Sequence, residues 1–139
     1  MDNSKIIYLH GLESTSQSGK ARQFAQLFPG MVTPDFTGSF EERMEQLAPI
    51  LADKTDWTII GSSFGGLMGT VFTCNHPTQV RKLILLAPAL LRDHFASYLD
   101  LEPVSIPTVI IHGTEDDVVP LKPVRELAEK TFSNLKYIV

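Results

Sequence analysis

The stretch Gly61-Ser62-Ser63-Phe64-Gly65 decides the fold of this 139-residue chain. It follows the apolar run Trp57 to Ile60, which is typical of a buried strand, and it opens a helical pattern. A sharp turn from strand to helix strains the central residue, and small neighbours let its side chain project from the sheet. Gly61 and Gly65 supply that room, so Ser63 is a candidate nucleophile. The alternative is a glycine-rich turn in which a serine only caps the helix.

Alternating strand and helix patterns surround this turn. Helical patterns lie between most of the predicted strands, and the pattern after Ser63 places Phe64, Leu67, Met68, Val71 and Phe72 on one face. Apolar strands joined by helices predict a parallel sheet that helices cover on both sides. We therefore expect one domain over residues 1–139, a three-layer α/β/α sandwich with a sheet of about six strands. The predicted strands are Ile6 to Leu9, Met31 to Thr33, Trp57 to Ile60, Leu83 to Leu86, Val109 to His112 and Leu135 to Val139.

Composition and charge exclude several classes of function. Hydrophobic residues make up 43% of the chain, and no segment approaches the roughly 18 apolar residues that span a membrane. The start shows no signal peptide, so a cytoplasmic location is expected. A net charge of -4 with scattered basic residues argues against nucleic-acid binding. The single cysteine, Cys74, excludes an internal disulfide and a cysteine-based metal cluster, and no dinucleotide fingerprint is present. We expect no metal and no cofactor.

Three motifs follow three different predicted strands. They are Leu9-His10-Gly11-Leu12, the stretch Gly61 to Gly65, and His112-Gly113-Thr114-Glu115-Asp116-Asp117-Val118-Val119-Pro120. Right-handed crossovers bring the loops after parallel strands to one edge of the sheet, where ligands bind. The combination resembles the α/β-hydrolase family. Within that family, Tyr8 to Thr15 followed by Ser18-Gly19-Lys20-Ala21 looks most like the small YqiA-like bacterial esterases.

The resemblance assigns roles to residues of the first two motifs. It implies a serine esterase in which Ser63 is the nucleophile. The backbone amides of Leu12 and Phe64 would form the oxyanion hole. His10 would be structural, with its ring bonded to loop backbone, and Gly11 would shape the loop beside it.

The third motif supplies the acid that the resemblance implies. Asp116 matches the acid in the pattern His-Gly-x-x-Asp-x-x-Val-Pro. Asp117 and Glu115 are its immediate rivals. All three carboxylates could equally be a solvated loop before a helix, where negative charge meets the helix dipole favourably.

A serine nucleophile needs a base, and the family places a histidine in the loop after the last strand. The histidines of this chain are His10, His76, His94 and His112, and none occupies that place. His94 is the candidate substitute, because it follows the fourth predicted strand in a region that can fold over the active-site edge. It could equally be a polar flank of the apolar stripe Leu91, Phe95 and Leu99.

The resemblance also implies a final helix beyond Val139, on the sheet face that the helix of Ala21 to Phe28 covers. Without that helix, apolar strand residues on this face would meet water, and large exposed apolar patches are uncommon on soluble monomers. We therefore expect either a longer gene product with the histidine downstream, or a homodimer through this face or the edge strand Leu135 to Val139.

The expected substrate is a small or medium carboxylic ester or thioester. Only about twenty residues separate Leu86 from Thr108, which is too few for a separate cap domain. Leu90 is one candidate for an apolar rim of an open site, although it could equally close the core. The alternative function is a non-catalytic scaffold or inactive fragment, because no histidine occupies the family's position.

Overall fold

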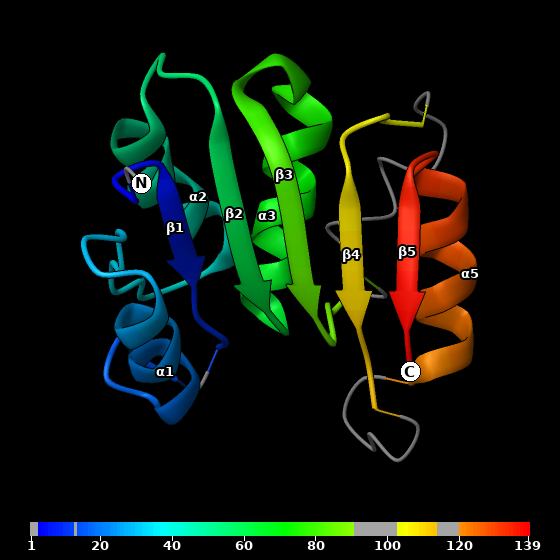
Figure 1. Cartoon of the computed structure of the whole chain (residues 1–139), viewed down its shortest axis with the longest axis horizontal. Coiled ribbons are helices and arrows are strands. Elements are labelled where there is room, and N and C mark those ends of the chain that lie inside the picture. Colours follow the sequence, from blue (N-terminus) through cyan, green and yellow to red (C-terminus); the bar gives the residue numbers. More distant parts are fainter. Residues whose placement is uncertain (1–2, 13, 91–102, 114–119) are drawn as a thin grey trace.

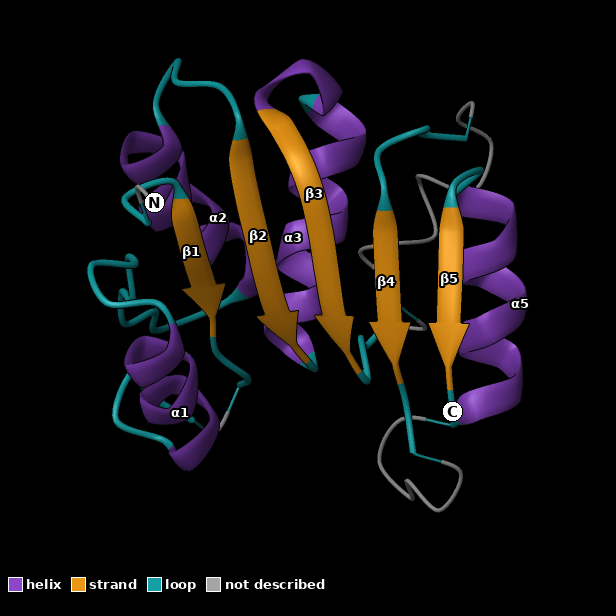
Figure 2. Ribbon diagram, viewed as in Figure 1, coloured by secondary structure: helices purple, strands orange, loops and turns teal. Residues whose placement is uncertain are grey.

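Five parallel strands form one sheet in the order β1-β2-β3-β4-β5 in the computed structural model, which describes residues 3–12, 14–90, 103–113 and 120–139 (Figure 1). All five arrows point the same way, so the loops that follow the strands gather at one edge of the sheet (Figure 2). The protein therefore has the parallel α/β architecture that the alternating pattern predicts. The strands are β1 (Ile6–Leu9), β2 (Trp57–Ser62), β3 (Val80–Leu86), β4 (Thr108–Ile111) and β5 (Leu135–Ile138).

The predicted strand at Met31 to Thr33 is only a single bridge, in which Val32 pairs with Ile7 in parallel. Val32 accepts from the amide of Tyr8 at 2.9 Å and donates to the carbonyl of Ile6 at 2.8 Å. The next donor along this segment would be residue 34, and Pro34 has no N–H to give. The ladder therefore stops after one bridge.

Helices lie on both faces of the sheet. On one face, apolar residues of α2, α3 and α5 form the main core with strand residues such as Ile7, Ile59 and Leu83. On the other face, α1 packs at β1 in a smaller cluster that contains Tyr8, Ala21 and Ile60. None of the helices in the described ranges is long and apolar enough to cross a bilayer. The helices are α1 (Gly19–Leu27), α2 (Phe40–Leu51), α3 (Phe64–Asn75) and α5 (Leu121–Thr131), with a 3-10 turn at Pro77–Gln79.

A row of apolar side chains crosses the part of the sheet that α1 does not reach. Leu86, Ile111 and Ile138 are in register on neighbouring strands, next to Ser62 of β2. Ile111 is 45% exposed and Ile138 is 40% exposed. The apolar exposure that we expected on the α1 face is therefore present, at β4 and β5.

Candidate active site

Ser63 is the single residue between the end of β2 and the start of α3. Its backbone is in the left-handed region, with φ 53° and ψ -111°. A positive φ costs a residue with a side chain about 1–3 kcal/mol and is concentrated at functional sites. The Ser63 hydroxyl makes no capping bond to α3, although Ser63 stands at the N-cap position. This geometry disfavours the simple capping role and is compatible with the predicted nucleophile.

The backbone of Ser63 is fixed by three hydrogen bonds. Its amide donates to the Leu86 carbonyl at 2.9 Å, and its carbonyl accepts from the amides of Leu67 at 3.2 Å and Ala89 at 3.0 Å. These partners belong to the end of β3, the first turn of α3 and the segment after β3. The surrounding structure therefore holds the strained conformation in place.

Both glycines of the elbow are required by close backbone contacts. A Cβ atom at Gly65 would clash with the carbonyl groups of Leu9 and His10. A Cβ atom at Gly61 would lie 2.5 Å from the Gly65 carbonyl oxygen. The elbow can therefore press against β1, which brings Ser63 next to the loop that follows that strand.

This neighbouring loop contains Gly11 and Leu12, the predicted oxyanion segment. A Cβ atom at Gly11 would lie 3.7 Å from the Cβ atom of Ser63, so the loop backbone passes directly beside the serine. The amide of Leu12 has no acceptor within the described ranges. Phe64 is the first residue of α3, where backbone N–H groups point out of the helix. The structure therefore brings Ser63, Leu12 and Phe64 together.

His10 holds the loop in place and has a defined tautomer. Its Nε2 atom accepts from the amide of Phe36 at 2.8 Å, so the proton lies on Nδ1. Nδ1 is 2.7 Å from the Gly11 carbonyl oxygen and therefore donates to it. That carbonyl belongs to the same peptide group as the Leu12 amide. His10 is 1% exposed, and both of its ring nitrogens are engaged.

A second group of polar side chains lies on the α1 side of the elbow. The phenol of Tyr8 lies near the hydroxyls of Ser62 and Ser18. Burial raises the pKa of Tyr8, while the nearby hydroxyls of Ser62 and Ser18 act in the opposite direction. The ammonium of Lys20 lies 3.5 Å from the Ser62 hydroxyl. Lys20 of α1 therefore contacts Ser62, the residue that precedes Ser63.

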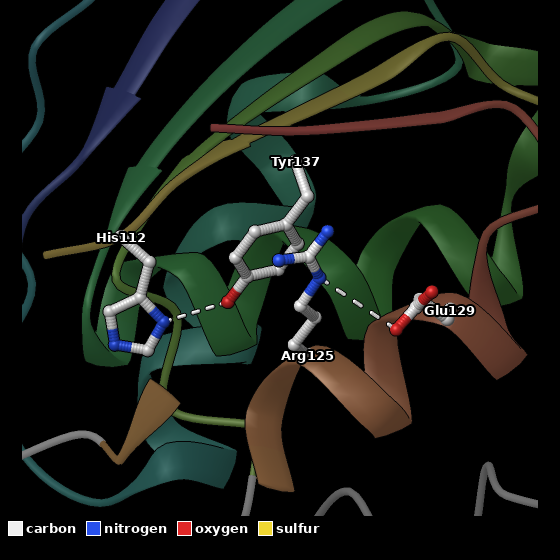
Figure 3. A network of polar contacts seen from close by, with 4 residues as sticks. All are labelled: His112, Arg125, Glu129 and Tyr137. Atoms are coloured by element: carbon white, nitrogen blue, oxygen red, sulfur yellow. Dashed lines mark hydrogen bonds and ion pairs between the residues drawn. The ribbon is translucent and has the colours of Figure 1, made fainter. Parts of the chain in front are cut away.

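The ends of β4 and β5 are joined by a hydrogen bond between His112 and Tyr137 (Figure 3). The His112 Nδ1 atom lies 2.8 Å from the Tyr137 hydroxyl, and His112 is 1% exposed. Arg125 of α5 lies over the Tyr137 ring at 4.9 Å and pairs with Glu129 at 3.8 Å. This network anchors the residue that precedes the predicted acid loop.

The predicted acid Asp116, its rivals Asp117 and Glu115, and the candidate base His94 all lie outside the described residues. The histidines that are described do not reach the elbow as a base. His10 is engaged with the carbonyl of Gly11, and His112 is bonded to Tyr137. His76 ends α3 at the far end from Ser63 and stacks on Phe72 with ring centroids 4.8 Å apart.

Two further expectations concern the site. Leu90, a candidate for the rim, is 1% exposed and belongs to the main core, so the core-closing role is the correct one. No cluster of three or more potential metal ligands occurs in the part of the chain that is described.

A family model described as uncharacterised protein family UPF0227 matches residues 5–130. The chain belongs to UPF0227. The match includes β1, the loop with Gly11 and Leu12 and the turn at Ser63, and it reaches into α5. No curated protein sequence matches this UPF0227 chain.

Solved structures show the fold of this UPF0227 chain. A YdeN-like hydrolase from Pectobacterium atrosepticum superposes with a TM-score of 0.77 at 16% identity, over 96% of this chain and 75% of that one. Est1E from Butyrivibrio proteoclasticus, with ferulic acid bound, gives 0.75 at 16% identity, over 96% and 77%. A monoacylglycerol lipase from Paleococcus ferrophilus gives 0.74 at 15% identity, over 96% and 82%. The chain therefore has the α/β-hydrolase fold.

Arg43 is a residue of the site that the sequence patterns did not indicate, and the fold brings it against the loop with Leu12. Its guanidinium donates to the carbonyl of Leu12 at 3.3 Å and lies over the Phe64 ring at 5.4 Å. A signal was present, because Arg43 stands three residues after Phe40 and four before Leu47, on the apolar face of α2. A charged residue at such a position indicates a buried polar contact.

Proposed function

We propose that this protein is a serine hydrolase that acts on carboxylic esters or thioesters through an acyl-enzyme on Ser63. The observation that carries the proposal is the backbone of Ser63, which is held at a positive φ beside Gly11 while its hydroxyl makes no cap. Structural maintenance alone gives no reason to keep a serine in this strained conformation, since glycine adopts it without strain. A nucleophile elbow gives one.

In the proposed reaction the Ser63 oxygen attacks the substrate carbonyl carbon, and the hydroxyl proton moves to a base. The carbonyl oxygen becomes an oxyanion, which the amides of Leu12 and Phe64 stabilise by hydrogen bonds. Collapse breaks the bond to the leaving alcohol or thiol, which takes the proton from the protonated base. Water then attacks the acyl-enzyme by the same route and releases the acid and Ser63.

The substrate class follows from the chemistry of the elbow. A serine with an oxyanion hole suits acyl transfer, and Asp116 would orient the base, as it matches the acid of the resembled esterases. Among the solved neighbours are a monoacylglycerol lipase and the esterase Est1E, and these names support an ester substrate. Membership in UPF0227, together with the elbow and the oxyanion loop, supports the likeness to YqiA-like esterases.

A second candidate is a non-catalytic scaffold that keeps the fold of the hydrolases. It is favoured by the positions of His10, His76 and His112, none of which lies in contact with Ser63 in the described part of the chain. The two candidates differ in the reactivity of Ser63, which can be measured directly.

Hydrolysis of p-nitrophenyl acetate, butyrate and octanoate tests the proposal. We expect Ser63→Ala to lower kcat by roughly a thousandfold or more, because a missing nucleophile leaves only the effects of binding and the oxyanion hole. Ser62→Ala is the matched control, since it removes the neighbouring hydroxyl, and it should retain most of the activity. Turnover that is unaffected by Ser63→Ala would refute the assignment.

A fluorophosphonate probe separates the two candidates without turnover. Rapid, saturable labelling of Ser63 supports the hydrolase. Absence of labelling in a protein that melts as a folded domain supports the scaffold.

The variant His94→Asn tests whether His94 is the base. A large fall in the labelling rate would assign the base to His94, and an unchanged rate would exclude it.

A further inference from the structure

Arg43 is a buried cation at the end of the first turn of α2, at 5% exposure. Its Nε atom donates to the carbonyl of Gly38 at 2.9 Å, and its Nη2 atom donates to the carbonyl of Leu12 at 3.3 Å. The guanidinium carbon lies 5.4 Å from the centre of the Phe64 ring. The third nitrogen, Nη1, is buried and has no hydrogen-bond partner. Arg43 therefore contacts both residues whose amides form the proposed oxyanion hole.

No ion pair joins Arg43 to another residue in the described ranges. A guanidinium stays protonated in proteins, and burying a charge without a partner is strongly unfavourable. A buried nitrogen without a partner adds a further penalty and calls for an explanation. Packing alone would be served better by an apolar residue of similar size. Stability alone therefore does not account for a cation at this position, which indicates a role in the site.

The proposed reaction creates such a need. An oxyanion forms on the substrate beside the Leu12 amide, in a region of low dielectric where charges interact strongly. The Gly11 to Leu12 peptide group is held through its carbonyl by neutral His10. The Leu12 carbonyl on its other side is held by cationic Arg43. The loop with Gly11 and Leu12 is thus held from two sides, by His10 and by Arg43. The positive charge of Arg43 complements the negative charge of the transition state.

We propose that Arg43 is a positioning residue for the oxyanion hole, which orients the Leu12 segment and supplies a fixed positive charge behind it. The inference rests on the proposed hydrolase function and deepens it. A purely structural arginine would join the turn at Gly38 to the Leu12 loop by hydrogen bonds, and its replacement would change only the stability of the fold. A positioning arginine affects the transition state more than substrate binding, so it changes kcat and leaves KM nearly unchanged.

The test compares Arg43→Gln, which removes the charge, with Arg43→Lys, which keeps the charge and loses the forked contact. Arg81→Gln is the matched control, because Arg81 is exposed near the amino end of β3, at the opposite edge of the sheet from Ser63. Melting temperatures are measured first. The readouts are kcat and KM for p-nitrophenyl acetate, and the inhibition constant of a phenylboronic acid. The boronic acid becomes an anionic tetrahedral adduct on the serine and mimics the intermediate.

We expect Arg43→Gln to lower kcat roughly 10- to 100-fold and to weaken the binding of the boronic acid by a similar factor. This loss is somewhat smaller than the loss caused by removing a direct oxyanion donor. Arg43→Lys should lose only several-fold and should melt close to the native protein. If Arg43→Gln does not fold, Arg43→Lys serves as the test. A kcat and a boronic acid affinity equal to those of the native protein in Arg43→Lys would overturn the inference. Equal effects in Arg43→Gln and Arg81→Gln would overturn it as well.

Failure of the proposed function has a different signature. If the native protein shows neither Ser63-dependent turnover nor boronate binding, the hydrolase proposal fails before any arginine variant is compared. If the native protein shows either one, the variants test Arg43 alone.

Discussion

At the scale of single residues, the candidate active site depends on a serine with a strained backbone and on a glycine that leaves no room for a side chain. Ser63 tolerates a positive φ because three backbone hydrogen bonds hold it. Gly65 lets α3 approach β1, since any side chain there would meet the carbonyls of Leu9 and His10. The pentapeptide pattern predicted these features, because a strand-to-helix turn of this kind requires small residues on both sides of the serine.

Gly65→Ala should destabilise the protein by about 1–3 kcal/mol, because the added methyl group overpacks the contact with the β1 backbone. Urea unfolding followed by circular dichroism measures the change. Gly19→Ala is the matched control in a helix: its added Cβ would meet nothing within 4 Å. It should be neutral or stabilising by roughly 0.4–1 kcal/mol. Equal stabilities of the two variants would contradict the close approach of α3 to β1.

At the scale of elements, the segment between β1 and α1 is held by a link to a distant turn. The Asp35 carboxylate accepts from the Ser16 amide at 2.7 Å and from the Ser16 hydroxyl at 2.9 Å. The backbone hydrogen bond lowers the pKa of Asp35 below its usual 3.8, with a smaller effect from the hydroxyl. The periodicity of α1 was readable from the sequence. The link was not, because its two ends lie 19 residues apart.

This link predicts a pH dependence. Because the folded state lowers the pKa of Asp35, the carboxylate stabilises the fold above pH 3.8, and this contribution disappears as the pH falls through the lowered value. We expect Asp35→Asn to melt below the native protein at pH 7. The difference should shrink as the pH approaches 3. Asp53→Asn, an exposed aspartate after α2, is the control. A difference that stays constant from pH 7 to 3 would contradict the role of the charge.

At the scale of the whole molecule, the two faces of the sheet are covered unequally. Among the described helices, α2, α3 and α5 pack on one face, and α1 packs on the other face near β1 (Figure 1). Leu86, Ile111 and Ile138 form an apolar row on the second face. The outer edge of β5 has no neighbouring strand in the described ranges. We propose that a second copy of the chain covers this surface.

Light scattering after size exclusion tests this proposal. We expect a dimer that Ile111→Lys converts to a monomer, because a charge in a buried apolar contact is unfavourable. Leu27→Lys is the matched control, since Leu27 is 70% exposed on α1, away from the row. A native monomer at all concentrations, or a dimer that persists in Ile111→Lys, would refute the interface.

The sequence by itself determined the local parts of this protein: the elbow at Ser63, the helix that follows it, and the parallel sheet with its loops at one edge. These depend on periodicity and turn chemistry within a few residues. Tertiary structure alone decided the tautomer of His10, the bond from His112 to Tyr137 and the burial of Arg43 against Leu12. The partners in these contacts lie 26, 25 and 31 residues apart. No local pattern specifies such contacts, because packing of separate elements brings the partners together.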